Sequence, residues 1–253
     1  MTIRPNKFEP STASYGTTKS KLHLSKSYLI KNSERHLVRK DNIDYLYYAP
    51  KIKKIRIFFE GASMCGRIEV KKDLIDSLVF KTLHVHFDAI HNLDLRPSQQ
   101  ASCLTFSHDH LAQVNASWGI QPEWSKHPII NSQAETVTVK KTFSAVYALH
   151  RCVVPCSGWF EWTGNKENKT KYRFGHSSNQ VLFMAGIMFP DHQRDCSFVT
   201  LTTQADEQCA RYHHRMPLFI DPLKVSDWLS LPQMDQTPYM SSIKLPFTIS
   251  EPA

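Results

Sequence analysis

The residues of this chain that could do chemistry gather in four short motifs. In chain order these are Met64-Cys65-Gly66-Arg67, then Trp118-Gly119-Ile120-Gln121-Pro122-Glu123-Trp124 with Asn131-Ser132-Gln133 after it, then Gly158-Trp159-Phe160-Glu161-Trp162, and finally His213-His214-Arg215-Met216-Pro217. Together they offer a thiol, a carboxylate, an imidazole, guanidinium groups and indole rings. A thiol with a carboxylate and an imidazole is the residue set of nucleophilic catalysis assisted by a general acid and base.

Each of these residues also has a purely structural interpretation. In a chain with 6 cysteines, a given thiol is more often part of the packed core than a nucleophile. Glu161 could be a surface carboxylate on the polar face of a strand, His213 could hold a structural hydrogen bond, and the tryptophans could pack in the core. The 13 histidines form no cluster at metal-ligand spacing, so we expect neither a metal nor a cofactor.

The order and content of the four motifs resemble the SOS response-associated peptidase (SRAP) family, whose members are known as sensors of abasic DNA. The resemblance spans about residues 64 to 230 and depends on the motifs in combination, since no single one is specific. It implies that Cys65 is the nucleophile and that Asn131 lines the site. It also implies that Glu161 and His213 are the catalytic carboxylate and imidazole.

The resemblance further implies contacts with single-stranded DNA that contains abasic sites. Arg67, Pro97 and Trp118 match positions where the family holds DNA at its pocket. By residue type, Arg215 is suited to a phosphate, as Arg67 is. Three indole rings are suited to stacking on exposed bases: Trp118, Trp159 and Trp162.

The chain departs from the family pattern at several positions. Gln133 stands two residues after Asn131, where the family usually has arginine, so one expected phosphate contact of the DNA-binding set is lost. Asp94 stands where asparagine is common, and His214 where an aspartate or another polar residue is common. Because the nucleophile, the glutamate and the histidine are all present, we expect activity to be retained.

An N-terminal cysteine can capture the aldehyde of an opened abasic deoxyribose. Its α-amine, with a reference pKa of about 7.7–8.0, condenses to an imine, and its thiol, at about 8.5, then closes a thiazolidine ring. An internal cysteine cannot react in this way because its nitrogen is an amide. We therefore expect Cys65 to become N-terminal, either because translation starts at Met64 or because the site cuts the Met64–Cys65 bond itself. The chemistry would be that of an autopeptidase and a lyase-like crosslinking enzyme.

Two other functions remain open from the residues. One is a cysteine-dependent peptidase of the Cys-His type that acts on other peptides in trans. The other is a non-catalytic module that binds single-stranded DNA, with Cys65 blocked and a basic extension supplying affinity.

The net positive charge of the chain comes entirely from its first quarter. The formal net charge is +8, yet residues 1–63 hold 13 Lys and Arg against 5 Asp and Glu, and the remainder holds 18 of each sign. No apolar run approaches the length of a membrane span, and no secretory signal is visible at the start. We expect a monomer with free thiols in the cytoplasm, associated with the nucleoid and not with a membrane.

The patterns between the motifs predict one α+β domain around a mostly antiparallel, barrel-like sheet with a few flanking helices. Helices are predicted at residues 70–83 and 221–229. Strands are predicted at 111–117, 136–139, 151–154, 171–174, 181–188 and 197–202, with one or two more within 44–59. We expect this domain to span residues 64–240, after a basic extension (1–63) that is disordered or lies before the true start, and before a tail (241–253).

Overall fold

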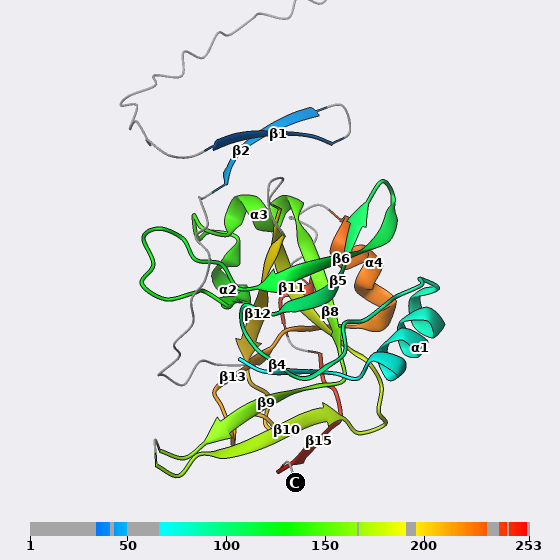
Figure 1. Cartoon of the computed structure of the whole chain (residues 1–253), viewed down its shortest axis with the longest axis vertical. Helices are drawn as coiled ribbons and strands as arrows, with labels where there is room; N and C mark the ends of the chain where they lie inside the picture. Colours follow the sequence, from blue (N-terminus) through cyan, green and yellow to red (C-terminus); the bar gives the residue numbers. More distant parts are fainter. Residues whose placement is uncertain are drawn as a thin grey trace, which may run out of the picture. The chain divides into compact units, whose positions relative to one another are not determined.

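The computed structural model describes the chain in segments (Figure 1). These are residues 66–165, 167–190, 196–231, 238–241 and 243–251, together with 34–40 and 43–49. For 34–40 and 43–49 only the backbone is described. The predicted nucleophile, Cys65, lies outside the described residues. Within the predicted extension, strands β1 (Glu34–Lys40) and β2 (Ile43–Ala49) pair as an antiparallel hairpin.

A five-stranded antiparallel sheet carries the motif Gly158-Trp159-Phe160-Glu161-Trp162 on one strand, and another of its strands begins directly after Arg67. Its strand order is β15-β10-β9-β3-β4, with β3 (Ile68–Val70), β4 (Asn92–Leu95), β9 (Gly158–Thr163), β10 (Thr170–His176) and β15 (Phe247–Ser250). Ile68 pairs with Leu95 on one side and with Trp159 on the other, and Trp159 pairs with Phe174. Since cross-strand partners share a face and these four are at most 1% exposed, they form an apolar face of this sheet.

The second sheet closes into a ring. Its order is β13-β12-β6-β5-β8-β11-β14, β7 is added beside β12, and an antiparallel pairing of β11 with β12 joins the two sides. The strands are β5 (Gln100–Ser107), β6 (His110–Trp118), β7 (Asn131–Gln133), β8 (Arg151–Cys156), β11 (Leu182–Phe189), β12 (Ser197–Gln204), β13 (Arg215–Pro217) and β14 (Phe219–Ile220). Only the pairings of β12 with β6 and β7 are parallel. The predicted α+β class is confirmed, and the barrel-like sheet takes the form of this ring.

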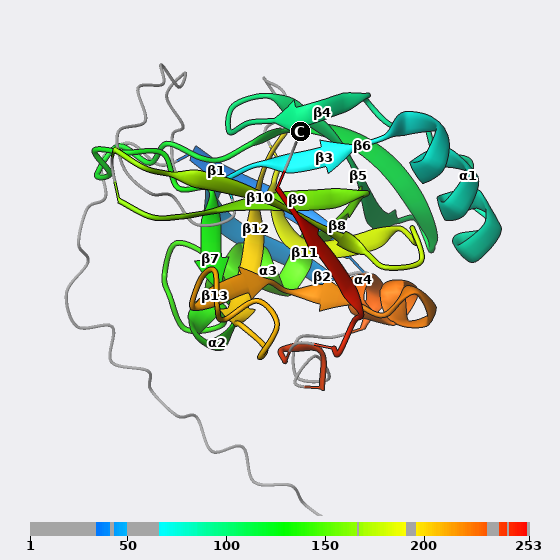
Figure 2. The same ribbon diagram turned by 90° about the horizontal axis from the view of Figure 1, so that it is seen from below.

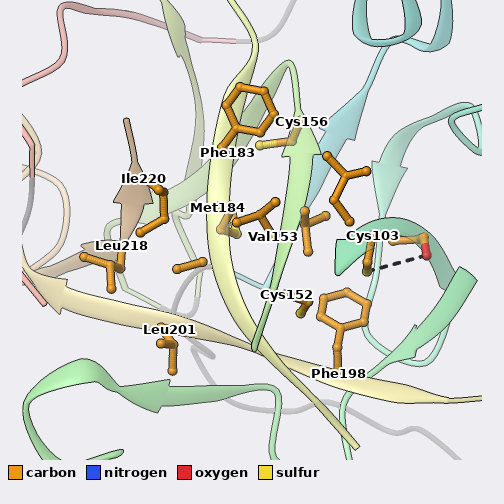
Figure 3. Close-up of a cluster of buried hydrophobic side chains, with 14 of the residues drawn as sticks. Cys103, Cys152, Val153, Cys156, Phe183, Met184, Phe198, Leu201, Leu218 and Ile220 are labelled. Atoms are coloured by element: carbon orange, nitrogen blue, oxygen red, sulfur yellow. Dashed lines mark hydrogen bonds between the residues drawn. The ribbon is translucent and has the colours of Figure 1, made fainter. Parts of the chain in front are cut away.

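Apolar side chains of the ring strands form a core (Figure 3). Every strand residue of β11 is buried, as expected for a strand covered on both faces. The buried side chains in this part include Cys103, Cys152, Val153, Cys156, Phe183, Met184, Phe198, Leu201, Leu218 and Ile220. All five cysteines of the described residues are free thiols, which confirms that expectation for them.

Short helices flank the sheets (Figures 1 and 2). They are α1 (Lys72–Leu83), α2 (Ala134–Val137), α3 (Ser144–Leu149) and α4 (Val225–Ser230), the last preceded by the 3₁₀ turn η1 (Pro222–Lys224). Helix α1 and the η1–α4 segment confirm the two predicted helices.

The strand predicted at 136–139 is wrong, because its first half belongs to α2. Ala134 and Val137, three residues apart, are 1% and 0% exposed. In one helical turn both side chains face the core, whereas in a strand they would point to opposite faces. Strand β5 was not predicted, and neither were the shorter strands β3, β4, β7, β13, β14 and β15.

Candidate functional site

Strand β3, which follows the Met64-Cys65-Gly66-Arg67 motif, is held firmly beside β9. The Phe160 N–H donates to the Arg67 carbonyl oxygen at 3.1 Å, and the Ser157 N–H donates to the Glu69 carbonyl oxygen at 2.9 Å. Gly66 is buried and Arg67 is half-buried. The chain that leaves Cys65 is therefore fixed against the strand that carries Glu161.

Glu161 is a buried carboxylate on β9. It is 4% exposed and lies opposite Tyr172 of β10 in the strand register. The Tyr172 ring lies 4.7 Å from the Tyr212 ring, measured between centroids, and Tyr212 directly precedes His213. Burial, together with the nearby Asp206 and Glu161 carboxylates, raises the pKa of the Cys209 thiol. Glu161 therefore lies near the loop that carries His213.

The loop before His213 is a compact turn. The Cys209 carbonyl oxygen accepts from the Tyr212 N–H at 2.9 Å and from the His213 N–H at 3.0 Å. The Asp206 carboxylate in turn accepts from the Cys209 N–H at 2.9 Å. These bonds fix the backbone at the position where the imidazole is attached.

The His213 ring has a backbone partner in either protonation state. The Arg215 N–H lies 3.0 Å from Nδ1 and can donate to it when the ring is neutral, which leaves the proton on Nε2. The Arg215 carbonyl oxygen lies 3.1 Å from the same nitrogen and can accept from it when the ring is protonated. Burial, with a smaller contribution from His214 and Arg215 charge, holds the pKa of His213 below its usual value of 6.5. The ring can therefore change its charge without losing its orientation.

Asn131 begins β7, which runs parallel to β12. The Thr200 hydroxyl lies 2.9 Å from the Asn131 side-chain oxygen and can donate to it, so the amide is oriented with its oxygen toward Thr200. Gln133, two residues later, pairs with Thr202 in the register and is exposed. The position where the family has arginine is thus a surface position without charge in this chain.

Arg215, predicted to hold a phosphate, is engaged by protein groups. Its two terminal nitrogens each donate to a Glu135 carboxylate oxygen at 2.8 Å, and Nη2 also donates to the Thr202 carbonyl oxygen at 2.6 Å. The Arg215 hydrogen bonds hold the pKa of Glu135 below its usual value. A phosphate at Arg215 would have to compete with this bidentate pair.

Three residues predicted to hold DNA are instead part of the interior. Trp118 is 0% exposed and its ring N–H donates to the Ile130 carbonyl oxygen at 3.0 Å. Trp159 is 1% exposed and stacks on Phe174 at 4.7 Å between ring centroids. Pro97 is buried as well. Neither tryptophan ring has an accessible face in this structure, and stacking on a base requires one.

Trp162 differs from those two rings. It is half-buried, and the Arg67 guanidinium carbon lies 5.7 Å from its centroid. The structure also shows two charged groups that the sequence patterns did not reveal. Asp94 is surrounded by Arg67, Arg96 and Lys171, and Glu69 is paired with Arg173. Alternation along β10 puts Lys171 and Arg173 on one face, but their carboxylate partners are far away in the chain.

Within the described segments, no group of three or more His, Cys, Asp or Glu side chains is placed to hold a metal ion. In the same segments, no helix has the length and apolar character needed to cross a membrane.

Comparisons with known proteins identify the family of the chain and its fold. The family model described as SOS response associated peptidase (SRAP) matches residues 64–249. Abasic site processing protein YedK of Escherichia coli (strain K12) is 26% identical over 176 residues, covering 66% of this chain and 79% of that protein. Abasic site processing protein YoaM of Bacillus subtilis (strain 168) is 26% identical over 200 residues, covering 73% and 86%. A crystal structure from Bordetella bronchiseptica has the same fold, with a TM-score of 0.65 and 19% identity over 75% of this chain and 100% of that one.

Proposed function

The chain belongs to the SOS response-associated peptidase (SRAP) family, and from that premise we propose that it captures abasic sites in single-stranded DNA covalently through Cys65. Support comes from the family match over most of the chain and from relatives named as abasic site processing proteins. The bound strand would present the aldehyde of an abasic nucleotide to Cys65.

One observation carries the proposal. Strand β3 begins three residues after Cys65 and lies against β9, where Glu161 is buried close to the loop of His213. Supporting the proposal, the strand that follows the thiol pairs with the strand of Glu161, and the loop that leads to His213 contacts the next strand through Tyr212 and Tyr172. A thiol, a carboxylate and an imidazole are the group set that stepwise addition to an aldehyde needs.

The proposed reaction has two bond-forming steps. The α-amine of Cys65 attacks the C1′ aldehyde, and the resulting carbinolamine loses water to give an imine. The Cys65 thiol then adds to the imine carbon and its proton passes to the nitrogen, which closes the thiazolidine. Glu161 would take a proton from the attacking amine and return it to the departing hydroxyl. His213 would protonate the sugar ring oxygen as the ring opens.

The reaction requires a free amine on Cys65. In the chain as given this nitrogen is part of the Met64–Cys65 peptide bond. Hydrolysis of that bond by the same site, or removal of Met64 as an initiator, would release it. We therefore expect the active species to begin at Cys65, which intact mass spectrometry of the native protein can test.

A crosslinking assay tests the function directly. The protein with Cys65 at its N-terminus is mixed with labelled single strands, one containing an abasic site and one intact, and the products are separated on a denaturing gel. We expect a stable adduct with the abasic strand only, no adduct with Cys65→Ala, and a much slower reaction with Glu161→Gln. Cys196→Ala, which alters a partly exposed thiol of the described chain, is the matched control and should react as the parent does.

Two results would contradict the proposal. An adduct that survives Cys65→Ala would show that another group reacts. The absence of any adduct, together with hydrolysis of unrelated peptides, would favour a peptidase that acts in trans.

A further inference from the structure

Three cationic side chains surround one carboxylate beside the candidate site. Arg67 Nη1 lies 2.5 Å and Arg96 Nη2 lies 2.8 Å from Asp94 Oδ2, while Lys171 Nζ lies 3.0 Å from Asp94 Oδ1. These four residues, called the cation cluster below, come from the position directly before β3, from β4 and the turn after it, and from β10. Three positive charges against one negative charge leave a net charge of +2.

The cation cluster lies on the face of the five-stranded sheet that is turned away from the core. Ile68 and Leu95 pair on the apolar face, so alternation along the strands turns their neighbours Arg67 and Asp94 to the other face. Side-chain exposure runs from 26% for Arg67 to 59% for Arg96, so a ligand can reach the cations.

Asp94 cannot satisfy the donors that surround it. Two guanidinium groups and one ammonium group bring thirteen N–H donors in principle, at five, five and three each. A carboxylate has two oxygens, and both already accept from these groups. Spare donors and uncompensated positive charge therefore remain for an anion.

Aromatic rings adjoin these cations. Lys171 Nζ lies 3.8 Å from the centroid of the Phe160 ring and 5.8 Å from that of Trp162. Of these two rings, Phe160 is buried and Trp162 is half-buried. Cations next to an accessible aromatic ring are the combination that binds single-stranded nucleic acid, with phosphates on the cations and a base on the ring.

We propose that the cation cluster is a phosphodiester-binding subsite for nucleotides that flank the abasic one, and that Asp94 limits its affinity. The inference rests on the proposed function. Glu161 and Trp162 are neighbours on β9, so their side chains point to opposite faces of the sheet. Glu161 belongs to the candidate site and Trp162 adjoins the cation cluster, so the two lie on opposite faces of the sheet at the same end of β9. Gln133 carries no charge, and Arg215 is paired with Glu135, so neither offers a free cation to a phosphate. Lys171 and Arg96 would supply cations in their place.

Asp94 remains an ionised competitor at neutral pH. Burial alone would raise the pKa of Asp94, but hydrogen bonds from Arg96, Lys171 and Arg67 lower it to about 2. A phosphate that enters the subsite must therefore share its cations with a permanent negative charge. Removing that charge should strengthen DNA binding.

Equilibrium binding of an intact, fluorescently labelled single strand tests the subsite, with anisotropy measured over a range of salt concentrations. Lys171→Gln and Arg96→Gln should each weaken binding about three- to tenfold at low salt and reduce the slope of log K against log salt by about 0.7. Asp94→Asn should tighten binding. Lys81→Gln, at the end of α1 and outside the cluster, is the matched control and should bind as the parent does.

The two proposals can fail separately. If the parent binds and crosslinks DNA but Lys171→Gln and Arg96→Gln bind as Lys81→Gln does, the subsite is overturned and the proposed function stands. If the parent neither binds nor crosslinks, both are overturned. Unfolding midpoints establish that each variant is folded. If Asp94→Asn is unstable, the two glutamine variants decide, since they change side chains that are 31% and 59% exposed.

Discussion

Replacing Arg173 with methionine should destabilise the folded protein by about 3–5 kcal/mol at pH 7, because it removes the hydrogen-bonded counter-ion of a buried carboxylate and leaves only the longer contact with Lys71 at 3.5 Å. The Glu69 side chain is 8% exposed. It accepts from Arg173 Nε at 3.0 Å, from Arg173 Nη2 at 2.5 Å and from the Ser157 hydroxyl at 2.9 Å. The variant loses two hydrogen bonds between charged groups, each of about 1.5–3 kcal/mol, which agrees with this range.

The pH dependence gives a second, independent check. Burial alone would raise the pKa of Glu69, but hydrogen bonds from Arg173 and Ser157 and the neighbouring positive charges hold it below its usual value of 4.5. In the parent protein this stabilisation is present above pH 4.5 and is lost as the pH falls through the folded-state pKa. In Arg173→Met the hydrogen bond from Ser157 and the charge of Lys71 remain, but the hydrogen bonds and charge of Arg173 are lost, so the pKa of Glu69 should rise above its value in the parent. The stability deficit of the variant should then shrink as the pH is lowered from 7 toward 5.

Urea unfolding followed by tryptophan fluorescence at pH 7 and pH 5 measures both effects. Lys224→Met is the control, because it removes an exposed pair with Asp227, 3.2 Å apart, and should leave the unfolding midpoint unchanged. If the free energy of unfolding of Arg173→Met at pH 7 lies within about 1 kcal/mol of that of the parent, the inference that burial makes the loss of this ion pair costly is refuted. If the stability deficit of Arg173→Met instead grows as the pH is lowered, the inference that Glu69 is ionised in the folded protein at pH 7 is refuted.

Three further predictions concern other parts of the chain. Gln133→Arg should tighten single-stranded DNA binding and make the slope of log K against log salt concentration steeper by about 0.7. An unchanged slope would show that no phosphate reaches this position. Because burial keeps the pKa of His213 below 6.5, any stability that the parent has over His213→Gln should fall as the pH is lowered from 7 to 5, which denaturant titrations at both pH values can measure. Arg151→Met should cost about 2–4 kcal/mol in thermal or urea unfolding. The 4%-exposed Arg151 donates to carbonyl oxygens of two helix ends, including those of Tyr147 at 3.0 Å and Trp228 at 2.6 Å, and no loss of stability would mean that water replaces these bonds.

Local patterns predicted the elements with strong periodicity and failed where tertiary packing decides. The helix predicted at 70–83 is α1, and the apolar run at 181–188 is the buried strand β11. The segment 136–139 carries β-branched residues typical of a strand, yet the core accommodates Val137 on a helical turn. Strand propensity expresses how well a side chain packs in a half-buried sheet, so a short run does not determine the outcome.

The sequence by itself determined the family, the fold class and the motifs, because these are encoded in residue types at short spacings. Only the tertiary structure decided which of the predicted residues are accessible. It buries Trp118 and Trp159, pairs Arg215 with Glu135 across 80 positions, and joins Lys171 to Asp94 across 77. Accessibility and counter-charge depend on the pairing and register of strands that are distant in the chain. A local pattern carries no information about that register, because the partners of a strand meet only when the whole sheet forms.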